Sequence, residues 1–131
     1  MDFQPSEEQA AMRDMVAEFA ANELAPYAVE WDQAKHFPVD ALRKAAGLGL
    51  AGIYTRGDVG GSELTRLDAA LIFEVLAGGC PTIAAYISIH NMCTWMIDAY
   101  GSDEQRQRWL PRLTSMEFLA SYCLTEPGAG S

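Results

Sequence analysis

The longest uncharged stretch of the chain, residues 75–97, sets the strongest constraint on its fold. A Gly-Gly-Cys-Pro segment ending at Pro81 interrupts the stretch, and polar residues such as Ser88 and Asn91 follow. The uninterrupted apolar part is therefore shorter than the ~20 residues that a membrane-spanning helix needs. We predict a buried helix over residues 82–100 instead.

This predicted helix has only one polar side, a narrow stripe formed by Asn91, Thr94 and Asp98 at helical spacing. A helix that is apolar on most of its circumference is buried on most of it. We therefore expect the apolar remainder to form the buried part, and Gly101 to end the helix.

Three short sequences have the form of a capping box, in which a hydroxyl residue and an acid or amide three positions later satisfy each other's backbone N–H groups. They predict helix starts at the pairs Ser6 and Gln9, Thr65 and Asp68, and Ser102 and Gln105. Two further helices are predicted over residues 27–33, after Pro26, and over residues 39–46, between Pro38 and a C-terminal cap at Gly47.

Apolar residues at helical spacing predict the buried side of three of these helices. The stripes are Met12, Met15, Val16 and Phe19 in the first, Leu67, Ala70, Leu71 and Val75 after Thr65, and Trp109, Leu110 and Leu113 after Ser102.

The fold class predicted is all-α, a bundle of about six helices over residues 1–116. The pattern then changes, and residues 118–125 read as a buried strand that runs into the loop 126–131. An isolated strand cannot satisfy its backbone groups without partner strands. We therefore expect residues 117–131 to begin a second, β-rich domain that the chain does not contain.

Charge and cysteine content exclude several classes of function. Nine basic against eighteen acidic residues give a formal net charge of −9, which argues against nucleic-acid binding. Cys80, Cys93 and Cys123 form no CxxC pair, and the only histidines are His36 and His90. We expect no metal site and no disulfide framework, but three small buried thiols. The N-terminus has the features of neither a secretory signal nor an Arg-rich transit peptide.

The terminal loop, residues 125–131, carries the clearest chemical signal. Gly128 and Gly130 allow a ligand to approach the backbone closely, and Thr125 and Ser131 offer hydroxyl groups. Such a loop suits a flat heterocycle on one side and a phosphate or pantetheine on the other. A plain turn is the alternative interpretation.

The segment Tyr-Cys-Leu-Thr-Glu-Pro-Gly-Ala-Gly-Ser at residues 122–131 resembles a signature of the acyl-CoA dehydrogenase family. The Ser-Glu-Glu-Gln opening, Phe37-Pro38, the Gly60-Gly61 loop and the segment 101–111 also occur in family order, so the resemblance covers essentially the whole chain. One departure is Glu63, where many members carry glycine.

The resemblance implies that Tyr122, Leu124 and Thr125 contact the isoalloxazine ring of FAD, with Gly130 and Ser131 completing the cofactor-binding loop. Ser131 would also lie beside the acyl-CoA arm. The family reaction is an α,β-dehydrogenation in which a glutamate removes the α proton. That base belongs to the C-terminal domain in most members, so no catalytic residue is expected in this chain, and Glu126 is not the base.

The segment 85–98 further resembles the isobutyryl-CoA branch of the family, which implies a short, branched substrate. Ser88, Met92 and Trp95 would then line the end of the acyl pocket. The alternative is that this stripe is ordinary core, and His90 is expected to be a packed, hydrogen-bonded histidine rather than a catalytic one.

As partners, the resemblance implies an acyl-CoA substrate, electron-transfer flavoprotein and further copies of the chain, with neither nucleic acid nor membrane. FAD is expected to bind the full-length protein tightly and residues 1–131 weakly or not at all. A bacterial cytoplasmic location is expected, or the mitochondrial matrix in a eukaryote. The alternatives are an acyl-CoA oxidase or nitroalkane oxidase of the same fold, or a non-catalytic helical interaction module.

Overall fold

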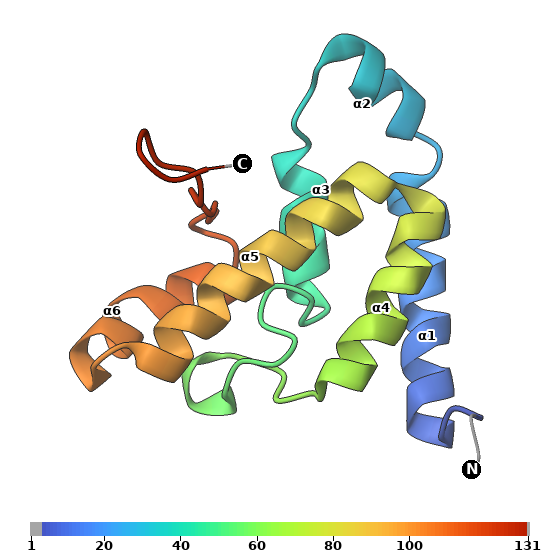
Figure 1. The fold of residues 1–131 in the computed structure, drawn as a ribbon. Helices are drawn as coiled ribbons and strands as arrows, with labels where there is room; N and C mark the ends of the chain where they lie inside the picture. The colour runs from blue at the N-terminus through green and yellow to red at the C-terminus, as the bar shows by residue number, and fades with distance from the viewer. Residues whose placement is uncertain (1–3, 131) are drawn as a thin grey trace.

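The computed structural model describes residues 4–130, which form six α-helices (Figure 1). In chain order these are α1 (Glu7–Phe19), α2 (Ala28–Ala34), α3 (Val39–Gly47), α4 (Arg66–Gly79), α5 (Pro81–Tyr100) and α6 (Asp103–Thr114). A π-helical turn, Ala20–Leu24, extends α1 towards Pro26, and a 3₁₀ turn, Gly57–Val59, lies in the loop between α3 and α4. The predicted all-α, six-helix fold is confirmed.

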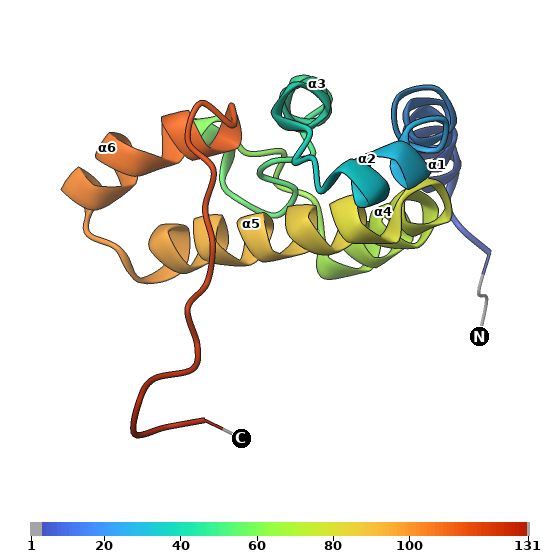
Figure 2. The same ribbon diagram turned by 90° about the horizontal axis from the view of Figure 1, so that it is seen from above.

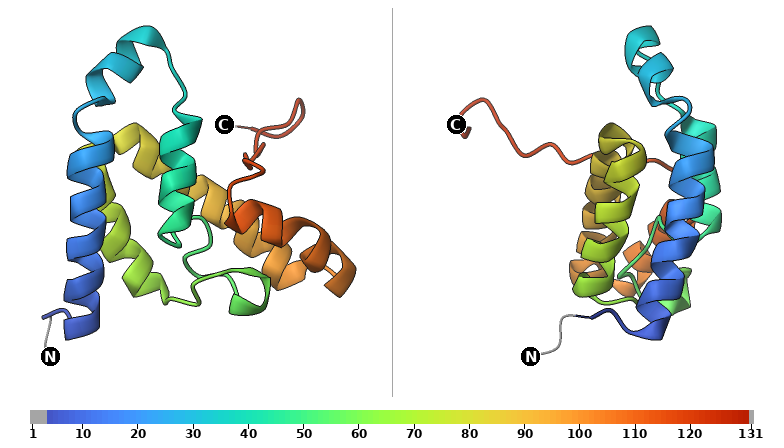
Figure 3. Two further views of the ribbon diagram at one scale, coloured as in Figure 1. Left: turned by 180° about the vertical axis from the view of Figure 1, so that it is seen from behind. Right: turned by 90° about the vertical axis from the view of Figure 1, so that its right-hand side faces the viewer.

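The helices are arranged in two layers. Figure 2 and the right-hand view of Figure 3 show α4 and α5 on one side and α1 and α3 on the other. Helix α1 packs along α4, α4 packs against α5, and α5 packs against α6. No helix among the described residues is long and apolar enough to cross a membrane.

All three predicted capping boxes are formed. In α1, α4 and α6 the side chains of Ser6, Thr65 and Ser102 each accept a hydrogen bond from the backbone N–H three residues later, and the reciprocal bond is present. These starts are encoded within four residues, which is why the sequence predicts them well.

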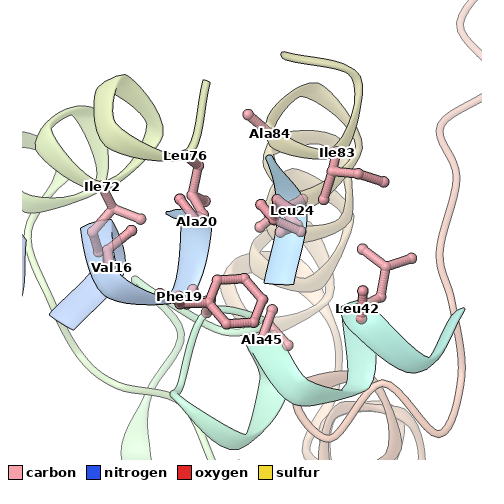
Figure 4. Packing of buried hydrophobic residues seen from close by; sticks show 14 of the residues in the cluster. Val16, Phe19, Ala20, Leu24, Leu42, Ala45, Ile72, Leu76, Ile83 and Ala84 are labelled. Carbon is pink, nitrogen blue, oxygen red and sulfur yellow. The ribbon is translucent and has the colours of Figure 1, made fainter. Parts of the chain in front are cut away.

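The main core lies between the two layers, where side chains from α1, α3, α4 and α5 point towards one another (Figure 4). Its members include Val16, Phe19, Ala20, Leu24, Leu42, Ala45, Ile72, Leu76, Ile83 and Ala84. The end of α4 approaches the π-helical turn closely at Gly79, where a Cβ atom would lie 2.9 Å from the carbonyl oxygen of Ala20.

The predicted apolar stripe of α4 is wrong by a rotation about the helix axis. The buried residues are Ala69, Ile72 and Leu76, whereas Leu67 is 62% exposed. Because α4 is apolar on nearly all sides, its periodicity does not select one face.

The stripes predicted for α1 and α6 are confirmed in part. In α1, Val16 and Phe19 are buried and Met15 is exposed. In α6, Leu110 and Leu113 are buried and Trp109 is exposed.

The predicted cap at Gly47 is also wrong, because the glycine that ends α3 is Gly49. Gly47 is the last helical residue, and Gly49 adopts a φ of +82°. The N–H groups of Gly49 and Leu50 donate to the carbonyls of Ala46 and Ala45, which is the Schellman arrangement.

Residues 117–130, here called the tail, do not form the predicted buried strand. No strand is present in residues 118–125, and the chain is exposed from Ser121 to Gly130. Figures 2 and 3 show the tail crossing α5 and projecting beyond the α4–α5 layer. A strand forms only by pairing with another strand, and the described residues offer no partner. Residues 121–130 therefore remain exposed to solvent.

Candidate functional site

The polar stripe of α5 is buried and holds the loop that follows α3. The Asn91 side chain accepts a hydrogen bond from the Ile53 N–H at 2.7 Å and donates to the Leu50 carbonyl at 2.8 Å. Asn91 and Thr94 have no exposed surface. The buried side of α5 thus includes the polar stripe as well as apolar residues such as Ile83 and Ile87, so the expected burial of the apolar remainder holds for only part of it.

About two turns beyond Asn91 on α5, Asp98 is the centre of an ion-pair network. Its Oδ1 accepts from Nε of Arg56 and from Nε of Arg106, each at 2.9 Å, and Arg106 also binds Asp58. Burial opposes the charge of Asp98, but hydrogen bonds from Arg56 and Arg106 outweigh it and hold the pKa of Asp98 below its ordinary value. Asn91 and Asp98 thus tie the loop to α5 at two points.

The loop itself depends on glycine. A Cβ atom at Gly61 would lie 1.9 Å from the carbonyl oxygen of Thr55, so only glycine fits there. Glu63 adopts a φ of +54°, in the left-handed region that glycine occupies without strain.

The opposite side of α5 is apolar and open. It carries Ala85, Ser88, Ile89, Met92 and Met96, which are half-buried or exposed. The predicted acyl-pocket residues Ser88 and Met92 lie one turn apart on this side, here called the open face. The Ser88 hydroxyl donates to the Ala85 carbonyl at 2.7 Å, so its oxygen keeps its lone pairs for another donor.

Trp95, the third predicted pocket residue, lies one turn beyond Met92 but is engaged elsewhere. The guanidinium of Arg66 lies 4.6 Å from the centre of the Trp95 ring and 3.6 Å from the centre of the Tyr54 ring. Tyr100 packs edge-on against Trp95, with the ring centres 5.7 Å apart. The structure therefore brings Ser88 and Met92 together and places Trp95 in a separate aromatic cluster.

The predicted cofactor residues lie on the exposed tail. Tyr122 is 41% and Leu124 71% exposed, and an antiparallel bridge between Glu126 and Ala129 closes a tight turn. The turn brings Thr125 against Gly130, where a Cβ atom would lie 2.8 Å from Thr125 Cγ2. Ser131 lies outside the described residues.

The start of the tail is fastened to α5 and α6, and of the side chains that hold it only His90 was singled out from the sequence. The Arg112 guanidinium covers the ring of Phe118 at 3.6 Å from its centre. Ala120 is held by two side chains of α5: Tyr86 donates its hydroxyl proton to the Ala120 carbonyl, and the Ala120 N–H donates to His90. No sequence signal links Tyr86 to Ala120, because the contact joins residues 34 positions apart.

His90 is packed and hydrogen-bonded, as expected, with no exposed surface. Its Nδ1 accepts from the Ala120 N–H at 3.1 Å, so the ring proton is on Nε2, which donates to the Leu113 carbonyl at 2.9 Å. Burial lowers the pKa of His90. The imidazole is therefore neutral and fully engaged.

The thiols differ from one another. Cys80 and Cys93 are buried, as predicted, but Cys123 is exposed on the tail, and burial raises the pKa of the Cys93 thiol. In the part of the chain that the structure describes, no group of three His, Cys, Asp or Glu side chains could hold a metal ion.

The two-layer helical body with its projecting tail places the chain in a class of helical domains that stand at the N-terminus of longer proteins. The model of the family described as "Acyl-CoA dehydrogenase, N-terminal domain" matches residues 6–117. The chain belongs to this family.

Similar proteins narrow the comparison. The chain is 58% identical over 126 residues to the mitochondrial isobutyryl-CoA dehydrogenase of Bos taurus and 53% identical to that of Dictyostelium discoideum, covering 96% of this chain and 30% of each relative. A solved structure described as the FAD complex of PigA matches with a TM-score of 0.92 and 31% identity, covering 100% of this chain and 35% of that chain. The chain thus spans about a third of the length of the proteins it matches.

Proposed function

We propose that the chain is the N-terminal part of an FAD-dependent acyl-CoA dehydrogenase acting on a short, branched substrate such as isobutyryl-CoA. The observation that carries the proposal is the identity of 58% and 53% with two isobutyryl-CoA dehydrogenases over 126 residues. In this proposal residues 1–116 are the helical domain, and residues 117–131 begin the next domain.

The tail has the chemistry that a flavin needs. Thr125 makes no hydrogen bond through its hydroxyl to any described residue, and the Tyr122 ring and Leu124 are exposed, so one donor and two apolar surfaces are left for a ring system. Around Gly128 there is open space for a close approach to the backbone. When bound, FAD would supply the hydride acceptor, while Tyr122, Leu124, Thr125, Gly130 and Ser131 bind and orient it.

The tail crosses α5 and projects on the side away from α1 and α3 (Figures 2 and 3). Asn91 faces the loop that follows α3, so the open face is on the other side of the helix. Ser88 and Met92 would meet the acyl group there and limit its length. Trp95, which Arg66 and Tyr100 hold in its own cluster, would contribute to the pocket only from one turn further along α5. The half-buried Met92 side chain offers an apolar surface, which suits a small branched hydrocarbon chain better than it suits a polar group.

Within the described residues no carboxylate is buried with the open face, and Glu126 is exposed on the tail. The base that removes the α proton would therefore come from a part of the protein outside this chain, and residues 1–131 alone would be inactive and bind FAD weakly or not at all. Electron-transfer flavoprotein as acceptor, assembly with further copies, and a matrix or bacterial cytoplasmic location belong to the same proposal.

The test is to express the open reading frame that contains residues 1–131 and assay it with isobutyryl-, butyryl-, 2-methylbutyryl- and isovaleryl-CoA, using an artificial electron acceptor. A yellow protein with the highest kcat/KM for isobutyryl-CoA is expected. Thr125→Val is a matched variant that replaces only the hydroxyl by a methyl group and should weaken flavin retention.

Two results would contradict the proposal. Turnover that consumes oxygen without an added acceptor would indicate an acyl-CoA oxidase. A protein that retains no flavin and is inactive with every thioester would indicate a helical interaction module.

A further inference from the structure

The backbone of Ala120 is held on both sides of its Cα atom by one helix. The Ala120 N–H donates to Nδ1 of His90 at 3.1 Å, and its carbonyl accepts from the Tyr86 hydroxyl at 3.1 Å. Tyr86 and His90 are four residues apart, hence one above the other on α5. We refer to these two side chains as the clamp.

Each side chain of the clamp is itself fixed. His90 has no exposed surface, and its Nε2–H is used by the Leu113 carbonyl, so Nδ1 can only accept. The Tyr86 ring packs edge-on against Phe37, with the ring centres 4.9 Å apart. The clamp is therefore positioned by the segment before α3, by α5 and by α6 before it meets the tail.

The arrangement imitates a β-ladder. In an antiparallel pair, a hydrogen-bonded residue exchanges both its N–H and its C=O bond with one partner residue. At Ala120 the two side chains of α5 take the place of that partner. The exposure of the tail to solvent changes at Ala120: residues 118–120 are half-buried, whereas residues 121–130 are exposed.

We propose that Tyr86 and His90 are positioning residues that fix the register in which the tail leaves the helical body. Side chains alternate between the two faces of an extended chain, so a slip of one residue at Ala120 would exchange the face of Tyr122 and Leu124 with that of Cys123. By holding Ala120, the clamp decides which side chains the tail presents to the cofactor. The inference rests on the proposed function for what the tail binds, but the clamp can be tested without it.

The first test measures amide hydrogen exchange of Ala120 in residues 1–131. His90→Gln keeps a donor near the Nε2 position for Leu113 but removes the acceptor for Ala120, and His90→Asn keeps an acceptor near Nδ1. Tyr86→Phe removes only the hydroxyl. We expect Ala120 exchange to accelerate by roughly tenfold in His90→Gln and Tyr86→Phe, and less in His90→Asn.

The Ile53 amide, which is bonded to Asn91, is the internal control and should keep its protection in all three variants. Unchanged Ala120 exchange in His90→Gln and Tyr86→Phe would overturn the clamp. If the Ile53 amide also loses protection in one variant, the mobility of a spin label on the exposed Cys123 replaces the exchange measurement. For this labelling the two buried thiols are removed by Cys80→Ala and Cys93→Ala. A label that is no more mobile in Tyr86→Phe than in the parent would likewise overturn it.

The second test uses the protein expressed from the whole reading frame. In His90→Gln and Tyr86→Phe we expect partial loss of flavin and a shifted flavin absorption spectrum, with His90→Asn closer to the parent. Faster Ala120 exchange with unchanged flavin content and spectrum would overturn the positioning role. Failure of the proposed function is distinguished from both, because the parent protein itself would then contain no flavin.

Discussion

The two sides of α5 are opposite in character and opposite to what hydrophobicity alone suggests. One side carries Asn91, Thr94 and Asp98 and is buried, because every one of these side chains has a partner. Asn91 bonds the loop before α4, Thr94 bonds the His90 carbonyl of α5 itself, and Asp98 binds Arg56 of the loop and Arg106 of α6. The other side carries Ile89, Met92 and Met96 and is open. The difference teaches that the polar side chains of this helix anchor the loop before α4, while apolar residues such as Ile83 and Ile87 join the core. Only the apolar side chains of the open face remain available for contact.

The largest effect is expected on the buried side. Replacing Asn91 by Leu keeps the size of the side chain but leaves the Ile53 N–H and the Leu50 carbonyl without partners. We expect the free energy of unfolding to fall by about 4 kcal/mol. Urea denaturation followed by circular dichroism measures it, and Met92→Leu on the open face, which should cost less than about 1 kcal/mol, is the control. Equal losses in the two variants would erase the distinction between the sides.

Asp98→Asn is expected to come next, with a loss of about 3 kcal/mol at neutral pH, because Arg106 then remains buried with one charged partner, Asp58. The folded-state pKa of Asp98 is lowered, so its contribution is present above the unfolded-state pKa and is lost as the pH falls through the folded-state value. The difference between parent and variant should thus shrink in acid. A difference that is independent of pH would show that charge is not its cause.

A smaller effect is expected from His90. Its pKa is lowered in the folded protein, so between that value and the unfolded-state pKa only the unfolded chain takes up the proton. Stability should therefore decline as the pH falls below about 6.5, with a slope of at most ~1.4 kcal/mol per pH unit. Denaturation of the parent and of His90→Gln between pH 7 and pH 5 measures the slope, which the variant should lack.

The smallest effects are expected on the open face and the tail. Leu124→Ala should change the free energy of unfolding by less than about 0.5 kcal/mol, because Leu124 is 71% exposed. Ile89 is 38% exposed and thus only partly solvated, so Ile89→Gln should cost less than about 1 kcal/mol. Light scattering of the same Ile89 variant should show less self-association than the parent protein. A loss above 1 kcal/mol in either variant would show that these residues belong to the core.

The sequence predicted the parts of the structure that depend on neighbours along the chain. The starts of α1, α4 and α6 follow from their capping boxes, and the break before Pro81 follows from its Gly-Gly-Cys-Pro segment. The orientation of α4 and α5 was not predictable in this way. Both helices are apolar around most of their circumference, and the contacts of Asn91 and Asp98 that orient α5 reach about forty residues back.

For the site, the motif in the tail was recognisable from sequence, and whether its residues bind FAD stays a prediction. The clamp at Ala120 was not recognisable, because a tyrosine and a histidine four residues apart on an apolar helix are typical of ordinary core. The predicted strand failed for a different reason: residues 118–125 have the composition of a strand, but strand structure requires a neighbouring strand.

The bonds from Asn91 and Asp98 to the loop have a consequence for the chain while it is being made. Synthesis proceeds from the N-terminus. The Ile53 and Arg56 N–H groups therefore emerge about forty residues before the side chains of Asn91 and Asp98, which accept hydrogen bonds from them. Helix α1 can close its own start at once, whereas this loop has to remain hydrated until α5 has followed. While residues 57–98 are being translated, the nascent chain therefore has its first helices, but the loop that follows α3 still lacks the bonds to α5 that anchor it.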